Sequence, residues 1–408
     1  MKRNNIALVT LITVLNLFVV GADACTSFIV SGKATKDGRP ILFKNRDTND
    51  LNNYLHYFKG SKYDYIGDVN VNPKSPGVWF GYNTAGFAIM NTAAYNLNGF
   101  NDKNDENGQD GVVMQLALAQ CTSLKDFENL LDSLPKPLNC NSNFGVIDAH
   151  GGCAYYETGN AGFVKFDVND PKIAPLGYLV RTNFGYSGDR SLDKGISRFQ
   201  EISGICLNLS GRNGFDISSA LEIPRCLTHG LTGQSLSENL PSSSSDNHLV
   251  AFRDFIPRYL TASTGIIQGV LPNESPLLTV CWTIIGSPLT TVAVPVMISN
   301  VPKTPALLDK TDAHGSKLCN WGLELKKTLF PIQRGEGADY ILLPKLINAQ
   351  KTGILQQLAP LEKEIVDRGE AVIAECRKKG KPDDSLTLYY NWVDRYLTNA
   401  YASLFSLK

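Results

Sequence analysis

The sequence predicts an α+β protein, because short strand-like segments are interspersed with helical ones and the chain ends in long helical stretches. Its apolar fraction of 43% and charged fraction of 19% are those of a globular protein, and 408 residues can bury one large core or two modest ones. The 39 basic and 39 acidic residues cancel, and there is no basic run. This balance argues against nucleic acid as a partner.

The first segment predicts a secretory signal peptide. Lys2 and Arg3 form a positive start, and Ile6 to Val20 is mostly apolar. Ala22-Asp23-Ala24 then places small residues at the two positions that a signal peptidase reads, with Cys25 directly after the cut. We therefore expect export to the periplasm or the extracellular space. The apolar run is too short to span a bilayer comfortably, and no later run approaches spanning length, so we expect no transmembrane anchor.

A cysteine directly after a signal peptide is also the residue that carries the lipid of a bacterial lipoprotein. Such signals normally have a leucine-like residue three positions before the cysteine, where this chain has Ala22, followed by Asp23. A binding lipoprotein modified at Cys25 is therefore the non-enzymatic alternative.

Removal of residues 1–24 would leave a domain of residues 25–408, in which we see no interdomain linker. It opens with a predicted β-hairpin, because the strand-like run Thr26–Val30 is followed by Asp37-Gly38, a strong turn signal, and by a second strand that starts with Pro40–Phe43. Cys25 thus lies at the start of the first strand.

Further elements follow from the same patterns of apolar and turn residues. Residues 346–408 are expected to form C-terminal helices packed on the domain, with a kink or break at Pro360. The other expected elements are a hairpin of 78–82 and 86–90, a helix over 112–134 in two pieces, strands at 144–147, 153–156 and 163–166, a short helix over 216–223, a polar loop over 230–247, and late strands over 277–285 and 291–297.

Common catalytic and cofactor motifs are absent from the sequence. It has no H-E-x-x-H, Walker A, G-x-S-x-G or Rossmann glycine pattern, and its nine cysteines include no C-x-x-C pair. We therefore expect neither a metal nor an organic cofactor. A Cys–His pair formed in space remains open, with His56 and His150 as first candidates.

Cleavage at the predicted site would itself create a nucleophile and a base. Cutting after Ala24 would place a thiol and a free α-amine on Cys25. Their reference pKa values are about 8.5 and about 7.7–8, so the amine can accept the thiol proton near neutral pH. Nucleophile and base then need no separate histidine.

Cys25-Thr26-Ser27, a turn, and then Lys44-Asn45-Arg46-Asp47 resemble the start of the N-terminal-nucleophile (Ntn) hydrolases that cleave linear amides. This group includes bile salt (choloylglycine) hydrolases, penicillin V acylase, acid ceramidase and the isopenicillin N acyltransferase family. Their mature chains start Cys-Thr and carry Arg-Asn-x-Asp about twenty residues on. Gly159-Asn160 and the segment from Trp282 to Pro295 look closest to the acyltransferase-like branch.

The resemblance implies roles for the charged element. Asp47 matches the aspartate that holds and orients the amine of the nucleophile. Lys44 has the spacing of the family arginine, whereas Arg46 has its residue type. Alternate residues of a strand share a face, so both remain candidates for the cation beside the thiol.

Three later residues follow in the family order. Asn91, at the end of a strand that starts with a glycine, resembles an asparagine that orients the nucleophile and binds the oxyanion. Asn183 resembles the asparagine of a Thr-Asn pair that supplies an oxyanion donor. Arg198, in Ser197-Arg198-Phe199 at the start of a helix, resembles an arginine behind the nucleophile that favours the thiolate.

The fold that the resemblance implies is a four-layer αββα sandwich. The implied reaction is cleavage of a linear N-acyl or peptide bond in a small molecule through a thioester at Cys25. Hydrolysis, acyl transfer and a dipeptidase of the related Cys-first branch remain open. The oligomeric state is not predicted.

Overall fold

The computed structural model describes residues 25–73, 77–97, 109–212, 214–299, 304–312 and 315–407. The predicted signal peptide lies outside the described residues. Among those that are described, no helix is both long and apolar enough to cross a bilayer.

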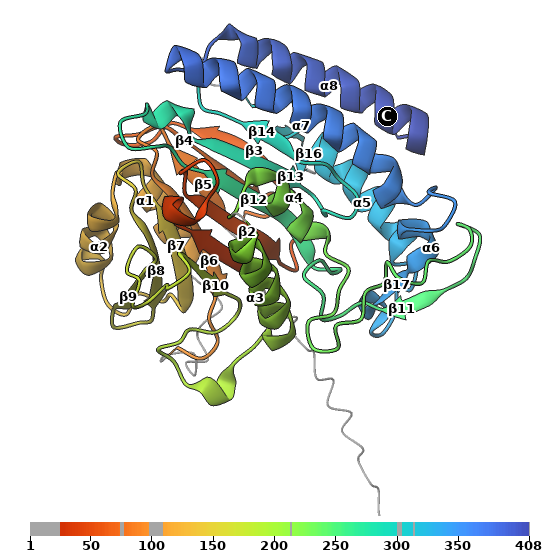
Figure 1. The fold of residues 1–408 in the computed structure, drawn as a ribbon, viewed down its shortest axis with the longest axis horizontal. Coiled ribbons are helices and arrows are strands. Elements are labelled where there is room, and N and C mark those ends of the chain that lie inside the picture. The colour runs from red at the N-terminus through yellow and green to blue at the C-terminus, as the bar shows by residue number, and fades with distance from the viewer. Residues whose placement is uncertain are drawn as a thin grey trace, which may run out of the picture.

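Two antiparallel sheets form the centre of the molecule (Figure 1). One has six strands in the order β10 (Tyr178–Arg181), β1 (Thr26–Val30), β2 (Ile41–Asp47), β12 (Thr261–Gln268), β13 (Val280–Ile285) and β14 (Val294–Val296). The other has seven in chain order, β3 (Asn53–Phe58), β4 (Tyr65–Asn70), β5 (Phe80–Asn83), β6 (Ala88–Ala93), β7 (Ser142–Ile147), β8 (Cys153–Thr158) and β9 (Phe163–Asp167). The sheets face each other, since β1 contacts β7 and β8 while β2 contacts β6.

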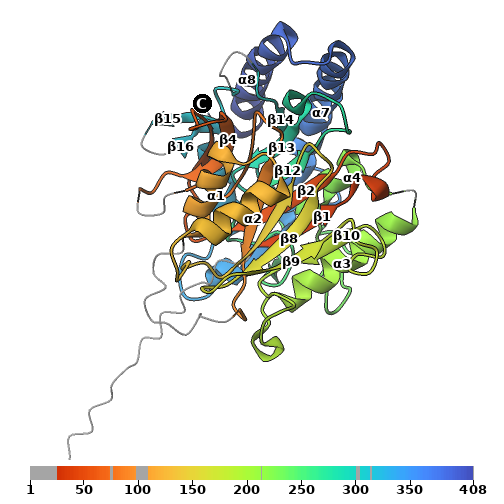
Figure 2. The same ribbon diagram turned by 90° about the vertical axis from the view of Figure 1, so that its left-hand side faces the viewer.

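Helices cover both outer faces (Figures 1 and 2). Helices α1 (Asp110–Gln120) and α2 (Leu124–Ser133) lie over the seven-stranded sheet, whereas α3 (Ile196–Gly211), α4 (Ile217–Glu222) and α7 (Ile354–Lys379) lie over the six-stranded one. The molecule is therefore a four-layer αββα sandwich, and the fold that we expected is confirmed. The remaining elements are α5 (Lys317–Leu329), α6 (Leu343–Leu346), α8 (Asp384–Phe405) on α7, and the strand pairs β11 (Leu249–Ala251) with β17 (Tyr340–Leu342) and β15 (Lys310–Asp312) with β16 (Gly315–Ser316).

Alternation along the strands decides which side chains enter the space between the sheets. Ser27 pairs with Lys44, and its hydroxyl lies 2.8 Å from the Tyr155 hydroxyl on the other sheet. Phe28 and Phe43 point the opposite way and stack with ring centroids 4.6 Å apart beneath the helical layer. The face that carries Ser27 and Lys44 is therefore the inner one.

A local sequence signal accounts for the start of α4. Asp216 caps α4 by accepting from the backbone N–H of Ser219, as its position before the helix predicts. Of the kink or break predicted at Pro360, the break does not occur, because helix α7 runs through this residue as one element. Pro360 removes only one backbone N–H donor from the helix. The packing of α7 on α8 and β14 stabilises the rest of it.

Candidate active site

Cys25 lies directly before β1, at the end of β2. It is 5% exposed, and its thiol lies 3.9 Å from the backbone oxygen of Asp47. Strand β1 is hydrogen-bonded to β10 on one side and to β2 on the other. The sheet thus fixes the backbone on which the thiol is mounted.

Arg198 contacts the backbone of Cys25 from the first turn of α3. Its Nη1 donates to the Cys25 carbonyl oxygen at 2.6 Å and to Thr26 Oγ1 at 2.9 Å. Its Nη2 donates to Asn183 Oδ1 at 2.8 Å. Burial lowers the pKa of the guanidinium to about 10, so the group remains charged at neutral pH. The structure therefore brings three of the predicted residues, Cys25, Asn183 and Arg198, into one cluster.

Gly195 makes room for this guanidinium. It precedes α3 with φ +74°, a conformation that favours glycine, and a Cβ on it would lie 2.4 Å from Arg198 Nη2. No sequence pattern marks this glycine, because its role depends on a contact with a side chain that only the fold brings close.

Asn183 follows β10, and its amide plane is held from two sides. Its oxygen accepts from Arg198, and its Nδ2 donates to the backbone oxygen of Ala93 at 2.9 Å. The side chain is thus a fixed dipole that shares the Arg198 guanidinium with the Cys25 carbonyl, and a fixed dipole is what an oxyanion-stabilising group requires.

Asp47 is held by two residues that sequence reasoning missed. Its Oδ1 accepts from Thr261 Oγ1 at 2.6 Å, and its Oδ2 accepts from Arg258 Nε at 2.7 Å. Burial would lower the pKa of Arg258, but the charge of Asp47 and the hydrogen bond to it outweigh burial and raise this pKa. No short motif marks Arg258, which lies 211 positions from Asp47.

Lys44 projects from β2 into the space between the sheets. Its Nζ donates to Asn91 Oδ1 at 2.6 Å and to the backbone oxygen of Trp79 at 2.8 Å. Burial lowers the pKa of its ammonium to about 8, although the nearby Cys25 thiol acts in the opposite direction. The group at the family arginine position can therefore lose its charge within an ordinary pH range.

Arg46 shares the inner face with Lys44 but has different partners. Its guanidinium donates to Asp68 Oδ2 at 3.3 Å and to Asn70 Oδ1 at 2.7 Å, and it lies 4.9 Å from the ring centroid of Trp79. A buried carboxylate thus balances Arg46, whereas Lys44 donates to a backbone oxygen and an amide oxygen, which are neutral. Lys44 and Arg46 are 1% and 2% exposed, so this element is not a solvated strand end.

Asn91 is positioned to orient Lys44. Its Nδ2 donates to Asp110 Oδ2 at 3.1 Å and to Ser142 Oγ at 3.2 Å, while its oxygen accepts from Lys44. Both amide hydrogens therefore have acceptors in the protein. This arrangement favours support of the cation over the expected donation to an oxyanion.

Lys326 is a second buried lysine that the sequence analysis missed. Its Nζ donates to the Thr261 backbone oxygen at 3.0 Å and lies 5.1 Å from the Tyr259 ring centroid. Burial lowers the pKa of this lysine to about 7, against the opposing effects of Cys319 and Asp47. Lys326 therefore lies behind the segment that holds Asp47.

Positive charge predominates around the thiol. Arg198, Arg258 and Lys44 surround Cys25 and the carboxylate of Asp47, and each of the three cations interacts electrostatically with the thiol. Such surroundings stabilise a thiolate and the oxyanion that forms when it attacks a carbonyl. The arrangement therefore suits nucleophilic attack by sulfur.

Comparisons with known proteins give one family match. Residues 34–200, less than half of the chain, match the family acyl-coenzyme A:6-aminopenicillanic acid acyl-transferase. No curated protein matches the sequence.

Several solved structures align over most of their own length. A mutant of the conjugated bile acid hydrolase from Clostridium perfringens is 13% identical, with TM-score 0.41 over 69% of this chain and 93% of that one. The Caenorhabditis elegans N-acylethanolamine-hydrolyzing acid amidase ortholog is 16% identical, with TM-score 0.37 over 61% and 94%. Penicillin V acylase from Agrobacterium tumefaciens is 12% identical, with TM-score 0.40 over 67% and 86%. Similarity at this level says nothing about the substrate.

The family match includes strand β2 with Lys44 and Asp47, and it extends past Arg198. It agrees with the αββα architecture and with the resemblance seen in the sequence. The segment that carries Lys44, Asp47, Asn183 and Arg198 is thus similar to the acyl-coenzyme A:6-aminopenicillanic acid acyl-transferase family.

Proposed function

We propose that this protein is an exported amidohydrolase that cleaves a linear N-acyl or peptide bond through a thioester at Cys25. Removal of residues 1–24 would expose Cys25 as the N-terminus. The observation that supports this most strongly is the cluster at the start of β1, where Arg198 donates to the Cys25 carbonyl and Asn183 is locked beside it.

In the first half of the reaction, the sulfur attacks the amide carbon while the thiol proton passes to the Cys25 amine. Asn183 and the surrounding cations stabilise the oxyanion of the tetrahedral intermediate. When the C–N bond breaks, the Cys25 ammonium returns the proton to the leaving amine, and the acyl group remains on sulfur.

In the second half, water attacks the thioester and gives one proton to the Cys25 amine. The C–S bond breaks, a carboxylic acid leaves, and the proton returns to the sulfur. Asp47, held by Arg258 and Thr261, orients the amine in both halves.

The use of the Cys25 α-amine as the base distinguishes this mechanism from that of a Cys–His enzyme. A chain with one uncleavable residue before Cys25 keeps the thiol but converts the amine to an amide, so it should fold normally and show almost no turnover. Intact mass and N-terminal sequencing verify both forms. Full activity of the extended chain, or a mature chain that starts elsewhere, refutes the mechanism, and a diacylglyceryl mass on Cys25 selects the lipoprotein alternative.

Thiol reactivity gives an independent test. Burial raises the pKa of Cys121 and Cys319 to about 12 and that of Cys226 to about 11, and it raises the pKa values of Cys153, Cys206, Cys281 and Cys376 as well. Cys25 should therefore be alkylated first near neutral pH once it is exposed, as peptide mapping after competitive labelling would measure. Equal labelling of Cys25 and Cys226 contradicts an activated thiol.

Acyl transfer is the second candidate, because the matching family is named for it. An amine would then replace water as the acceptor of the acyl group. Product ratios with increasing concentrations of 6-aminopenicillanic acid distinguish the two: a hydrolase gives carboxylate throughout, whereas a transferase gives the new amide. A panel of dipeptides tests the Cys-first dipeptidase alternative.

A further inference from the structure

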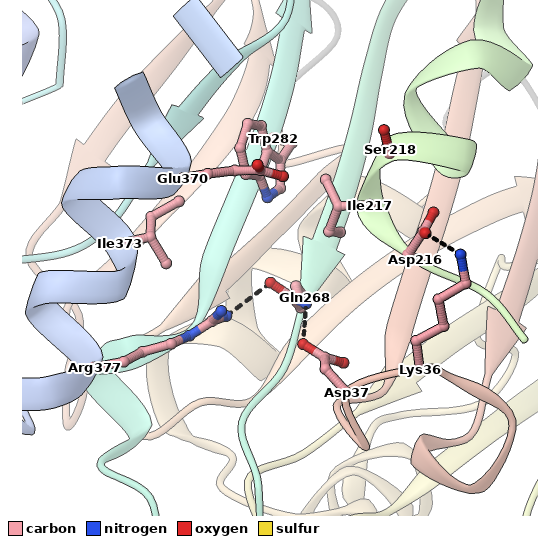
Figure 3. Close-up of a pocket in the computed structure, with 10 residues that line it drawn as sticks. All are labelled: Lys36, Asp37, Asp216, Ile217, Ser218, Gln268, Trp282, Glu370, Ile373 and Arg377. Atoms are coloured by element: carbon pink, nitrogen blue, oxygen red, sulfur yellow. Dashed lines mark hydrogen bonds and ion pairs between the residues drawn. The ribbon is translucent and has the colours of Figure 1, made fainter. Parts of the chain in front are cut away.

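A cavity of about 250 Å³ lies on the outer face of the six-stranded sheet, beneath α7 and beside α4 (Figure 3). Its floor is formed by Gln268 on β12 and Trp282 on β13. Trp282 pairs with Ile266, two residues from Gln268, so both side chains share the face that is opposite to Lys44 and the inner space. The cavity is therefore separated from the Cys25 site by the sheet itself.

Two N–H donors at this cavity lack acceptors among the described residues. Trp282 is 2% exposed, and its Nε1 has no hydrogen-bond partner; the same holds for the buried Nε of Arg377. Figure 3 draws the indole nitrogen of Trp282 on the edge of the ring that points toward Gln268 and Arg377. Buried donors without acceptors cost free energy, so two of them at one cavity favour a ligand that accepts both.

Arg377 is held in place by a neutral group. Its Nη2 donates to Gln268 Oε1 at 2.7 Å, and Gln268 in turn donates to Asp37 Oδ2 at 2.8 Å. No carboxylate of the described residues forms an ion pair with Arg377 within 4.0 Å. Burial and the nearby Arg39 lower the pKa of this guanidinium. A carboxylate is the group that a guanidinium edge binds best, and it would also accept from the indole.

The same cavity carries a carboxylate that suits a cation. Glu370 lies seven residues before Arg377, on the same face of α7, and burial followed by the charges of Asp367 and Asp216 raises its pKa. Lys36 is already paired with Asp216. Among Lys36, Asp37, Asp216, Glu370 and Arg377 there are three acidic and two basic groups, so a simple anion would enter a site with no surplus of positive charge.

We propose that this cavity binds a small zwitterion of dipeptide size, whose carboxylate is bound by Arg377 and Trp282 and whose ammonium is bound by Glu370. Seven residues of α-helix rise about 10 Å, so the two charged side chains start too far apart for the adjacent charges of one amino acid. A dipeptide separates its termini by an additional residue and fits the volume. This site is independent of the reaction proposed at Cys25.

The experiment is calorimetric titration of the full chain carrying Cys25→Ala, which prevents turnover of the probes. The probes are glycylglycine, N-acetylglycylglycine, which lacks the ammonium, and glycylglycinamide, which lacks the carboxylate. We expect saturable binding of glycylglycine and much weaker binding of the other two. Absence of saturable glycylglycine binding at millimolar concentration, or equal binding of all three, overturns the proposal.

Variants localise the binding. Trp282→Phe keeps an aromatic side chain but removes the indole N–H donor, and Arg377→Gln removes the charge; each should raise the Kd of glycylglycine by roughly tenfold or more. Glu370→Gln should weaken glycylglycine but not N-acetylglycylglycine. Trp392→Phe, which alters a tryptophan on α8 that is outside the cavity, is the matched control. Circular dichroism checks the fold of each variant. An unchanged Kd in a folded Trp282→Phe variant contradicts the site.

Discussion

The carbonyl oxygen of Cys25 accepts a 2.6 Å hydrogen bond from Nη1 of Arg198, a residue 173 positions further along the chain. This bond joins the start of β1 to the first turn of α3. The same guanidinium also donates to Thr26 and Asn183, so one side chain organises the backbone of the nucleophile and the candidate oxyanion donor.

Arg198→Lys should lower kcat while leaving KM nearly unchanged. Lysine keeps the charge but cannot reproduce the three fork-shaped contacts, so Asn183 and Cys25 lose their common support. The loss of charge-assisted hydrogen bonds predicts a decrease of about 10- to 100-fold. Steady-state kinetics would measure it, with Arg190→Lys on the surface as the control. An unchanged kcat would separate Arg198 from the reaction.

Gly195→Ala should reduce activity as strongly as loss of the Arg198 contacts does. The added methyl would meet Arg198 Nη2 at 2.4 Å. Gly233→Ala is a matched control, because Gly233 has a similar φ of +68° but no atom within 4 Å of the added Cβ. Both variants should lose on the order of 1 kcal/mol of stability from backbone strain, whereas only Gly195→Ala should lose activity. Equal kinetics of the two folded variants would contradict the role of Gly195.

Lys44→Arg should extend activity to higher pH. The Lys44 ammonium loses its proton as pH rises through about 8, and the thiolate then loses one of its stabilising cations. Arginine remains charged, so the alkaline decline of kcat/KM should move upward while the acidic limb, set by the Cys25 amine, stays in place. The pH profile of kcat/KM measures this shift. Coincident alkaline limbs would show that Lys44 does not control the decline.

Lys326→Met should change how stability depends on pH. The pKa of Lys326 is lowered from 10.5 to about 7, so between these values the unfolded chain binds more protons than the folded one. The wild-type free energy of unfolding therefore gains a contribution that grows from pH 7 to pH 10.5, on the order of 5 kcal/mol in total. The variant lacks this gain, so its stability relative to the wild type should fall over that range.

Urea unfolding at pH 6, 8 and 9.5 would measure the difference. Lys327→Met is the control, because Lys327 is the neighbour of Lys326 and its side chain is 66% exposed. A stability difference between Lys326→Met and wild type that is constant with pH would refute the assignment.

Local patterns predicted the elements that bear the nucleophile. Strand Thr26–Val30 and the Asp37-Gly38 turn each depend only on residues that are neighbours in the sequence. Gly38 adopts the expected positive φ of +79°. Cys25, Asp47, Asn183 and Arg198 also follow the order of the matching residues in the Ntn hydrolases, so the resemblance could suggest a role for each. The layered fold then followed from the resemblance rather than from the strand patterns alone.

The contact between Thr261 and Asp47 could not be predicted from the sequence, because it depends on pairing between strands that are distant in the chain. Strand β12 begins Thr-Ala-Ser-Thr-Gly, which lacks the apolar alternation of a typical strand, yet it pairs with β2 and brings Thr261 to Asp47. Lys44 and Arg46 were both candidates for the cation beside the thiol, and the acceptors on β6 and β4 that allow each to be buried lie outside their own segment. Burial of a charge depends on such partners, which the local sequence does not contain.

The sheet bonds on both sides of β1 have a consequence for the proposed base. Strand β1 is hydrogen-bonded to β10 and β2, and Arg198 donates to the Cys25 carbonyl, so the backbone of Cys25 is fixed. Under the proposed processing, the base is the α-amine of this same residue. Its position would therefore be set by the sheet, with none of the rotamer freedom of a side-chain base.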